Sequence, residues 1–596
     1  CRAWVLFNGF STELNINCQT HFGRLENNSI FWHFNIPIGQ GFIIQMNVSL
    51  SIAEEENGIQ ILFERCSSSK NKEELPNDKE ITLVIRPDIE DRNSHHITRA
   101  HDGVLNKWPQ VISTQSNGFI FEPDANRRLN IRLSEGNYIE ESEWYYNINH
   151  EIDIERKTDG YSDLFSPGYF QSSFLGGDKK ELIAGINCEP IFEIDDLPEV
   201  KSKPLIEKLS NSINSFIVNR NSLKTVIAGY PWFLDWGRDS LICLRGIIAA
   251  KKNNAEDILT QFASFEKDGT LPNMINGKDD ANRETSDAPL WMFVVCNDLI
   301  KQNHNILIKD CNGRSMMDVL TSIAENYISG TGNGIVMDKN SGLIFSPSHF
   351  TWMDTNYPAG TPREGYPIEI QALWYFALNF LYESTNNKRW KDLSDLVLKS
   401  IMKYFVIEDK GFTYLADNLK AEKNVSVAKA MQDDSLRCNQ LFAVTLISNL
   451  NGHLSKNILL SCEQLLVPGA IRSLANKTLK IPSPIYLDGE LINNPENPYK
   501  GHYIGEENKS RKPAYHNGTA WTWVFPTYCE ALLLTYGSSV TNKVRSLLNS
   551  SSILLEEGCI DHLPEILDGN TPHIQRGCSA QAWGSTEFFR VFSMLN

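Results

Sequence analysis

A membrane-spanning segment is missing from this sequence, because none of its apolar runs approaches the about 18 residues that cross a bilayer as a helix. The twelve cysteines are scattered, and no two of them form a Cys-x-x-Cys pair. This spacing argues against a zinc site and against a disulfide framework. It favours a reducing compartment, so we expect a cytoplasmic protein.

An excess of positive charge is also absent. Lysine and arginine number 56 against 73 aspartate and glutamate residues, and the formal charge is −17 at pH 7. Nucleic acids and anionic membranes require a basic face, so neither is expected as a partner, whereas an uncharged polymer is compatible. The glycines of Gly330–Val336 follow a helical pattern and indicate a turn, since no phosphate-binding Lys-Ser/Thr follows them. We expect no metal site and no cofactor.

Residues 1–195 carry short β-branched or alternating apolar runs, such as GFIIQMNVSLSI and EITLVIRPDI, separated by Asn, Gly, Ser and Asp clusters. This pattern is typical of an antiparallel β-sandwich. The domain could bind carbohydrate or serve as a scaffold for its neighbour, and the lack of an evident aromatic pair favours the scaffold. The chain begins with CRAWVLFNGF and no initiator Met, so we expect further residues before Cys1.

An acidic, proline-containing stretch at 196–204 predicts a linker. After it the period of the apolar pattern changes from that of a strand to that of a helix, so 205–596 should form a helical domain. The segments with clear helical periodicity are Leu205–Val218, Ser240–Lys252, Ala255–Phe265, Ser286–Ile300, Ile368–Leu381, Leu436–Leu450, Ala520–Tyr536 and Ala580–Leu595.

Two stretches, IEIQALWYFALNFLY and LFAVTLISNL, are apolar on nearly every side. Helices of this kind are enclosed by other helices. About a dozen helices that alternate between inner and outer positions indicate an α/α toroid, although an α-solenoid would give a similar pattern. The connections between the helices are therefore more informative than the helices.

These connections are rich in Trp, Tyr, Asp, Arg, His and Gly, whereas ordinary connections are short and made of turn residues. Aromatic rings stack on the C–H faces of sugars, and Asp, Arg, His and Gln bind hydroxyl groups, so the loops suit a neutral polyol. For any single tryptophan, anchoring of its loop on the core is an equally good interpretation. The loops are Gly229–Ser240, Asp268–Met274, Phe350–Glu369, Ala514–Trp523, His562–His573 and Gly577–Trp583.

Several of these motifs, GYPWFLDWGRDS, FTWMDTNYPAGTPREGYPIEIQALW, DDSLRCNQLFAV, YHNGTAWTW and GCSAQAW, carry a resemblance. Residues 205–596 resemble the C-terminal amylo-α-1,6-glucosidase domain of glycogen debranching enzymes. The part with VIRPDIEDRNSH and SDLFSPGYFQSSF is similar to the β-domain that precedes it in prokaryotic members. The resemblance implies a multidomain fold, with an N-terminal antiparallel β-sandwich followed by an (α/α)6 toroid of the six-hairpin glycosidase type.

The resemblance also implies two catalytic carboxylates. Asp354 matches the general acid of the family and Glu565 matches its general base. The two lie far apart in the sequence, so they must reach the site from different loops, as facing groups of an inverting glycosidase do. Asp354 stands among Trp352, Met353 and Tyr357, where partial desolvation would raise its pKa and keep it protonated.

Further positions are candidates for substrate binding. The resemblance assigns Asp235, Arg238 and Asp239 to the hydroxyls of the terminal glucose, although a buried Asp–Arg pair that braces the loop would give the same pattern. Asp287 could bind sugar or cap a helix, Arg363 could bind sugar or pair with Glu369, and His516 could be structural. Glu369 and Glu587 lie in helical runs and should bind backbone or arginine. The remaining candidates are Trp232, Trp236, Trp352, Trp521, Gln581 and Trp583.

The function that follows is an inverting glycoside hydrolase, an amylo-α-1,6-glucosidase that releases glucose from α-1,6 branch stubs of a glycogen-like α-glucan. An exo-acting, glucoamylase-like α-glucosidase on the same scaffold is one alternative, and a non-catalytic α-glucan-binding protein is another. Retention of both Asp354 and Glu565 counts against the second alternative.

Overall fold

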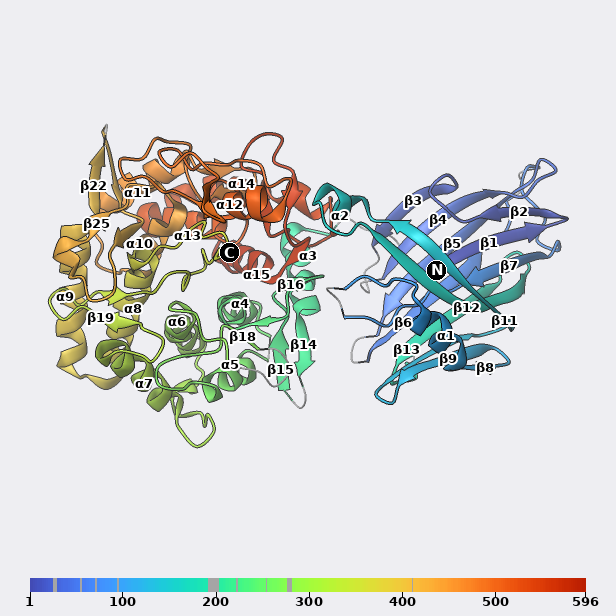
Figure 1. Cartoon of the computed structure of the whole chain (residues 1–596), viewed down its shortest axis with the longest axis horizontal. Helices are drawn as coiled ribbons and strands as arrows, with labels where there is room; N and C mark the ends of the chain where they lie inside the picture. The colour runs from blue at the N-terminus through green and yellow to red at the C-terminus, as the bar shows by residue number, and fades with distance from the viewer. Residues whose placement is uncertain are drawn as a thin grey trace. The chain divides into compact units, whose positions relative to one another are not determined.

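The structure, a computed structural model, divides into two compact units, Cys1–Ser202 and Lys203–Asn596 (Figure 1). The predicted linker at 196–204 lies outside the described residues except for its last two positions. The structure describes residues 1–24, 29–53, 56–69, 72–93, 96–190, 203–220, 223–252, 254–275, 281–409 and 411–595.

Two antiparallel sheets form the first unit, as Figure 1 shows. The five-stranded sheet has the order β11 (Asn137–Asn149), β12 (Tyr161–Phe174), β7 (Ile81–Arg86), β1 (Arg2–Phe7) and β2 (Phe10–Glu13). The eight-stranded sheet has the order β3 (Gln19–Arg24), β4 (Ile30–Pro37), β5 (Ile43–Ile52), β6 (Gly58–Arg65), β13 (Lys179–Ile186), β10 (Arg127–Leu133), β9 (Gly118–Asp124) and β8 (Ile112–Gln115). Two helices accompany them, α1 (Asp102–Gln110) and α2 (Glu151–Glu155).

The two sheets share one hydrophobic core. Phe119 of β9 lies 5.1 Å from Tyr138 of β11 and 6.3 Å from Phe170 of β12, measured between ring centroids. Strand residues point alternately to opposite faces, so the alternating runs seen in the sequence place one apolar face of each sheet in this core. The prediction of antiparallel sheets for the first part of the chain is confirmed.

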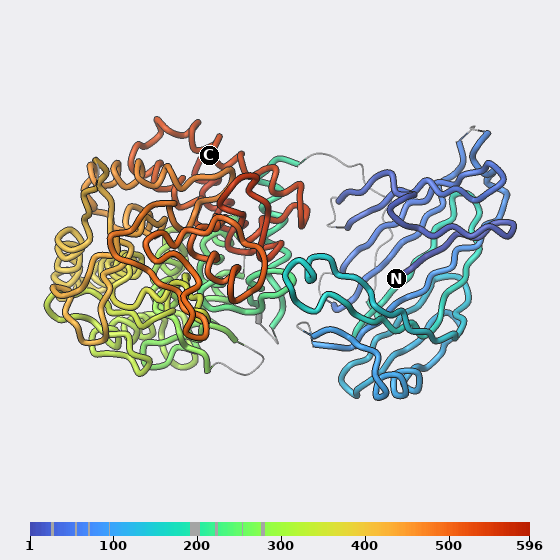
Figure 2. Tube along the Cα trace, turned by 45° about the horizontal axis from the view of Figure 1, so that its top comes forward, coloured from blue at the N-terminus to red at the C-terminus, as the bar shows by residue number. Residues whose placement is uncertain are grey.

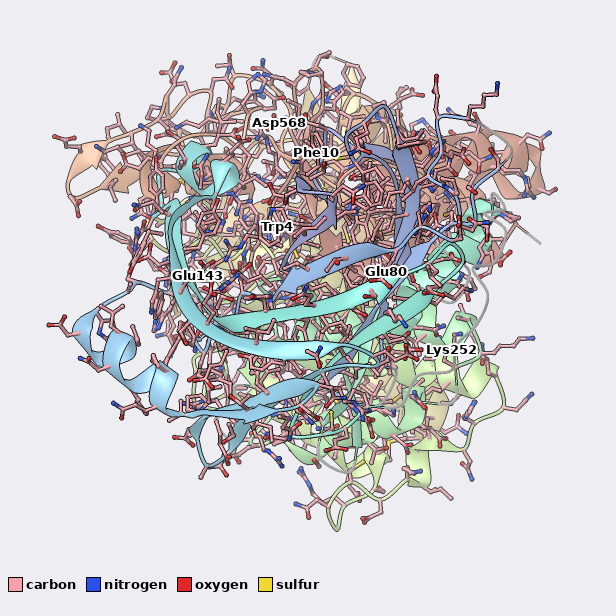
Figure 3. All side chains as sticks on the ribbon, turned by 90° about the vertical axis from the view of Figure 1, so that its right-hand side faces the viewer. Trp4, Phe10, Glu80, Glu143, Lys252 and Asp568 are labelled. Atoms are coloured by element: carbon pink, nitrogen blue, oxygen red, sulfur yellow. The ribbon has the colours of Figure 1, made fainter. Side chains whose placement is uncertain are left out.

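The opposite face of the five-stranded sheet carries aromatic rings that arginines cover. Trp4 and Glu143 are labelled on this unit in Figure 3. The guanidinium of Arg2 lies 4.7 Å from the ring centroid of Tyr145 and 5.8 Å from that of Trp4, and it pairs with Glu143. These rings take part in cation–π contacts on this face.

Thirteen helices occur in the described part of the second unit, and six of them pack in a closed cycle. Each contacts the next, and the last contacts the first. In this unit the last helices of the chain lie beside the first ones, and the path can be followed in Figure 2 by the colour change from green to red. The helices of the cycle are α4 (Gly237–Ala249), α6 (Ala288–Lys301), α8 (Ile368–Thr385), α10 (Leu441–Leu446), α13 (Phe525–Tyr536) and α15 (Ala582–Ser593).

Six further helices pack on the outside of this cycle, each against one or two of its members. They are α3 (Leu205–Phe216), α5 (Ala255–Ser264), α7 (Met316–Ser329), α9 (Lys388–Tyr404), α11 (Gly452–Glu463) and α14 (Thr541–Asn549). A thirteenth, α12 (Lys512–Tyr515), is one turn long. Within the described ranges, none of the helices is both long and apolar enough to cross a membrane.

The stretches that are apolar on every side belong to α8 and α10, and both lie within the cycle. All but one of the residues from Ile368 to Leu378 in α8 are buried, because its neighbours cover it on all sides. The apolar pattern therefore predicted correctly that these two stretches are enclosed. The outer helix α9, by contrast, has only five buried residues.

Candidate functional site

The loops rich in aromatic and charged residues all precede helices of the cycle. Arg238 and Asp239 stand in the first turn of α4, and Asp287 directly precedes α6. Asp354 lies in the loop before α8, and Trp521 lies in the loop before α13. The amino ends of these helices consequently meet at one face of the unit.

Two-residue strands tie these loops together. Strand β30 (Ala520–Trp521) pairs with β31 (Ile566–Leu567), and Trp521 lies opposite Ile566. Strand β16 (Gly229–Tyr230) pairs with β33 (Ala580–Gln581). Backbone ladders of this kind fix the side chains next to them, so Trp521 and Glu565 are held at a fixed separation although they are distant in the sequence.

These loops surround one pocket. Both predicted catalytic carboxylates line it, together with eight of the twelve predicted substrate-binding residues. Those eight are Trp236, Arg238, Asp239, Trp352, His516, Trp521, Gln581 and Trp583. Phe233 and Tyr515 also line the pocket and were not among the candidates, although both belong to motifs that the sequence analysis singled out.

Asp354 is held by a buried arginine. Nη1 of Arg238 donates to Oδ2 of Asp354 at 3.1 Å, and Nε of Arg238 donates to both oxygens of Asp287 at 2.8 Å. The Asp354 side chain is 33% exposed, whereas that of Arg238 is only 3% exposed. Burial raises the pKa of Asp354 above its ordinary value, and the positive charge of Arg238 only partly opposes this. Burial thus favours the protonated form of this pocket-lining carboxyl.

Glu565 is in a different environment, because two hydrogen-bond donors hold it. The hydroxyl of Tyr515 donates to Oε1, and the backbone N–H of Cys578 donates to Oε2 at 2.8 Å. Donors of this kind stabilise the charged carboxylate. Gly577 leaves the necessary space: a Cβ there would lie 2.3 Å from Oε2 of Glu565, and its φ of +69° suits glycine.

A third carboxyl, that of Asp239, lines the same pocket. Burial raises its pKa to about 7, the positive charge of Arg238 opposes this, and the charges of Asp354 and Glu565 add to the increase. Its oxygens accept no hydrogen bond from any residue that the structure describes. A hydroxyl of a bound ligand could supply the missing donor.

Aromatic rings form a wall of the pocket. Trp521 stacks on His516 with centroids 5.1 Å apart and planes at 12°, and Trp583 stacks on Trp523 at 4.6 Å and 18°. Trp352 meets three of these rings edge-on, and its indole N–H donates to Asn439 at 2.8 Å. The wall is rigid because each ring is fixed by another, which suits stacking against a sugar ring.

Three buried polar atoms of pocket-lining residues have no hydrogen-bond partner among the described residues. They are Nε2 of His516, Oε1 of Gln581 and the indole Nε1 of Trp583. Burial lowers the pKa of His516 well below its ordinary value, so its imidazole is neutral. A buried polar group without a partner is costly, and its presence indicates that a ligand or water completes it. Neutral donors and acceptors of this kind match hydroxyl groups.

Four predicted site residues do not line the pocket. Asp235 is buried and pairs with Arg220. This agrees with the interpretation of a buried Asp–Arg pair that braces the loop, but the arginine is Arg220 and not Arg238. Asp287 supports Arg238 and gives no side-chain cap to α6. Trp232 stands beside the pocket-lining Phe233 in the sequence but does not line the pocket.

Arg363 is the fourth of these residues. Nη2 of Arg363 donates to Oε2 of Glu369 at 2.7 Å, and its Nε donates to Asp417 at 2.7 Å. The arginine and both carboxylates are almost completely buried. Arg363 therefore pairs with Glu369, which is one of the two roles that the sequence allowed, and Glu587 likewise binds an arginine, Arg590.

Metal-ion chemistry was not expected from the sequence. Across the described ranges, no group of three or more His, Cys, Asp or Glu side chains is placed to hold a metal ion. The chemistry that the pocket offers is that of carboxyl groups, neutral hydrogen-bonding groups and aromatic faces.

Two family models match the chain. The one described as amylo-alpha-1,6-glucosidase matches residues 211–590, and the one described as glycogen debranching enzyme N terminal matches residues 24–181. The glycogen debranching enzyme of Saccharomyces cerevisiae (strain ATCC 204508 / S288c) is 23% identical over 416 residues, which are 55% of this chain and 26% of the yeast protein. The match thus spans about a quarter of that relative's length.

A solved structure resembles the whole chain. It is a bacterial glucoamylase complexed with acarbose, with a TM-score of 0.53 and 10% sequence identity, and the match covers 99% of this chain and 87% of that one. At this identity the likeness concerns the fold alone. The family follows from the sequence: since the first family model covers well over half of its residues, the chain belongs to the amylo-alpha-1,6-glucosidase family.

Proposed function

We propose that this chain is an inverting glycoside hydrolase that releases glucose from α-1,6 branch stubs of a glycogen-like α-glucan. We also propose that the second unit is an (α/α)6 toroid, which the closed cycle of six inner helices supports, and that the first is a β-sandwich. Family membership and the match to the yeast debranching enzyme support the substrate class.

One observation carries this proposal: two carboxyl groups from different loops line one pocket in contrasting environments. Burial raises the pKa of Asp354, whereas Glu565 accepts hydrogen bonds from two donors. Glycoside hydrolysis by inversion requires one protonated carboxyl and one carboxylate on opposite sides of the bond, about 6.5–9.5 Å apart. The contrast matches those two roles.

In the proposed reaction, Asp354 protonates the glycosidic oxygen of the leaving chain. Arg238 occupies Oδ2 of Asp354, which leaves Oδ1 to carry the proton. Glu565 removes a proton from a water molecule that attacks the anomeric carbon from the other side, so the product forms with inverted configuration. Tyr515 and the Cys578 N–H keep the carboxylate of Glu565 aimed at that water.

Recognition of the glucose ring would use hydrogen-bonding groups of the pocket that have no partner among the described residues. Asp239, Nε2 of His516 and Oε1 of Gln581 can accept from hydroxyl groups, and the indole N–H of Trp583 can donate to one. The aromatic wall would stack on the ring's C–H face. All these groups can bind an uncharged sugar through its hydroxyl groups.

The test is glucose release from phosphorylase limit dextrin. We expect release by the wild-type chain and a loss of several orders of magnitude in kcat for Asp354→Asn and for Glu565→Gln. Asp395→Asn is the matched control, because Asp395 is an exposed carboxylate of α9 whose one partner among the described residues is Lys391. Near-normal turnover by Asp354→Asn would refute the assignment of the acid.

Two other outcomes would change the proposal. Faster release from linear maltooligosaccharides than from isomaltosyl-branched ones would indicate a glucoamylase-like α-glucosidase. Tight binding of limit dextrin without any glucose release would indicate a glucan-binding protein.

A further inference from the structure

A second and larger cavity, of about 900 Å³, opens at the other end of the helical cycle. Its lining comes from the last turns of α6, α10 and α13, from the second half of α8 and from the start of α11. Trp521, just before α13, lines the pocket with the carboxylates, and Thr535, in its last turn, lines this cavity. The α13 helix of 12 residues separates the two sites by roughly 18 Å.

The cavity exists because α10 is short. The other helices of the cycle have 12 to 18 residues, whereas α10 has six. Its backbone becomes extended at Ile447, and the chain then turns into α11, where the side chain of Asn451 accepts a hydrogen bond from the N–H of His453. About two turns of helix are therefore missing from the inner layer, and the segment 447–450 passes along the edge of the space that is left.

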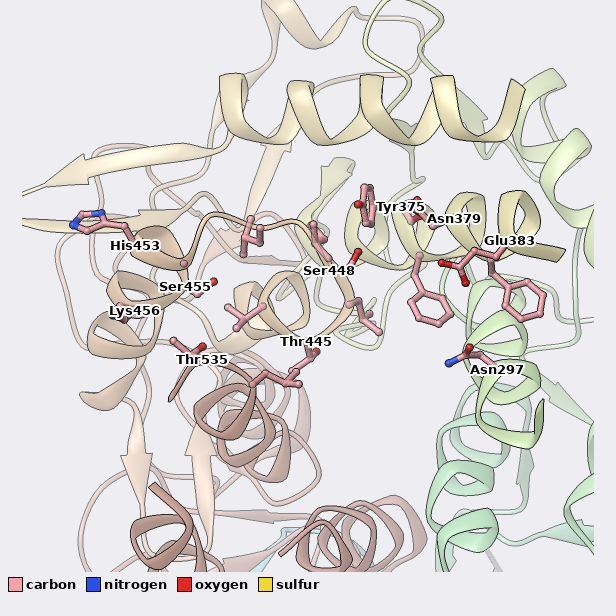
Figure 4. Close-up of a pocket in the computed structure, with 18 of the residues that line it drawn as sticks. Asn297, Tyr375, Asn379, Glu383, Thr445, Ser448, His453, Ser455, Lys456 and Thr535 are labelled. Atoms are coloured by element: carbon pink, nitrogen blue, oxygen red, sulfur yellow. The ribbon is translucent and has the colours of Figure 1, made fainter. Parts of the chain in front are cut away.

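Polar side chains line this space, and those of Glu383 and Ser448 are exposed. Figure 4 shows Tyr375, Asn379 and Glu383 along one side, on α8, with Ser448 and Thr445 between them and the start of α11. Among the described residues, none hydrogen-bonds to the side chains of Asn297, Glu383 and Ser448. The buried hydroxyl of Thr535 also has no partner in that part of the chain. An amide, a carboxylate and two hydroxyls are thus available to a ligand.

The charge balance of the cavity favours a neutral ligand. Lys301 and Lys456 contribute two positive charges, and Glu383 contributes one negative charge. Each helix carboxyl end adds roughly half a negative charge, so the three that end here add about −1.5, and the amino end of α11 adds about +0.5. The sum is close to zero, and a phosphate or nucleotide would find no net attraction. Neutral polyols need none, because they bind through hydroxyl groups and through contact with apolar carbon.

We propose that this cavity is a second, non-catalytic saccharide site that holds a segment of the α-glucan. Glu383 is the sole carboxylate among its lining residues, so the acid–base pair of a glycosidase is missing from it. Phe376 and Leu534 provide the apolar surface, and Asn297, Ser448 and Thr535 provide the hydrogen bonds. The choice of glucan as the saccharide rests on the proposed function.

The experiment counts binding sites by calorimetry with maltohexaose. The Asp354→Asn chain is used so that the ligand is not consumed. We expect two equivalents bound. Ser448→Trp in the same background should fill the cavity and remove one of them, and Asn297→Leu should weaken that one about tenfold by loss of its hydrogen bonds. Ser116→Trp is the matched control, since Ser116 lies at an exposed turn of the first unit. It should keep both equivalents.

A single equivalent that neither Ser448→Trp nor Asn297→Leu alters would overturn the inference. Saturation of the cavity by inorganic phosphate, with no effect of maltohexaose, would overturn it as well. Failure of the proposed function would look different. If the chain releases no glucose, but Ser448→Trp still removes one equivalent of bound maltohexaose, the proposed function is wrong and the second site is retained.

Discussion

Asp239 offers a quantitative test of the electrostatics of the pocket. Its pKa rises from 3.8 to about 7, because it is buried and lies near Asp354 and Glu565. At about 1.4 kcal/mol for each pKa unit, keeping this carboxylate charged costs the folded chain about 4 kcal/mol above pH 7. The unfolded chain has no such cost. Below about pH 4 the group is protonated in both states, and the cost disappears.

The sign of the effect follows from these values. Because the pKa of Asp239 is raised on folding, this group lowers the stability of the folded chain as the pH increases from about 4 to about 7. Asp239→Asn keeps the shape and removes the charge. We expect it to raise the free energy of unfolding by up to about 4 kcal/mol at pH 8 and to leave it almost unchanged at pH 4.

Urea unfolding followed by tryptophan fluorescence at pH 4, 6 and 8 measures this difference. Asp395→Asn is the control, because its carboxylate is exposed and should give a small effect at each pH. The reasoning is refuted if Asp239→Asn lowers the stability at pH 8, or if its effect is the same at pH 4 and pH 8.

Three further predictions concern the support of the site. Tyr515→Phe removes a hydrogen-bond donor from Glu565, so kcat should fall about tenfold to hundredfold and the acid limb of the pH profile should move to higher pH. An unchanged kcat would contradict the role of the hydroxyl. Arg363→Ala leaves the buried carboxylate of Glu369 without its arginine, whereas Asp417 keeps Arg437 and Asn439, and the change should cost about 3–5 kcal/mol in urea unfolding. A loss under about 1 kcal/mol would contradict this. Gly577→Ala would push a methyl group against Glu565 and should lower kcat about hundredfold, and unaltered kinetics would argue against the close approach.

Much of the second unit could be predicted from the apolar pattern. The helix expected over Ile368–Leu381 is α8, and the one expected over Ala255–Phe265 is α5. The segment Leu436–Leu450 was predicted as one helix, but α10 ends at Leu446. Continuous apolar residues cannot show where a buried helix stops, because the pattern contains no polar face whose end would mark it. The cavity beside α10 was consequently not predictable.

The residue types of the loops predicted a site for a neutral polyol, and the family resemblance assigned Asp354 and Glu565 to it. Asp354, Glu565 and their aromatic neighbours do line one pocket. Tyr515 was missed because a tyrosine next to His516 in the sequence gives no sign that its hydroxyl reaches Glu565, fifty positions away. Which buried carboxylates pair with arginines depends on packing between helices that are distant in the sequence.

The stereochemistry of the released sugar tests the central claim most directly. Proton NMR of glucose released from phosphorylase limit dextrin distinguishes its anomers before they equilibrate. If Asp354 and Glu565 act as acid and base on opposite faces of the bond, β-glucose appears first and α-glucose follows by mutarotation. Initial release of α-glucose, or no release at all, would contradict the account.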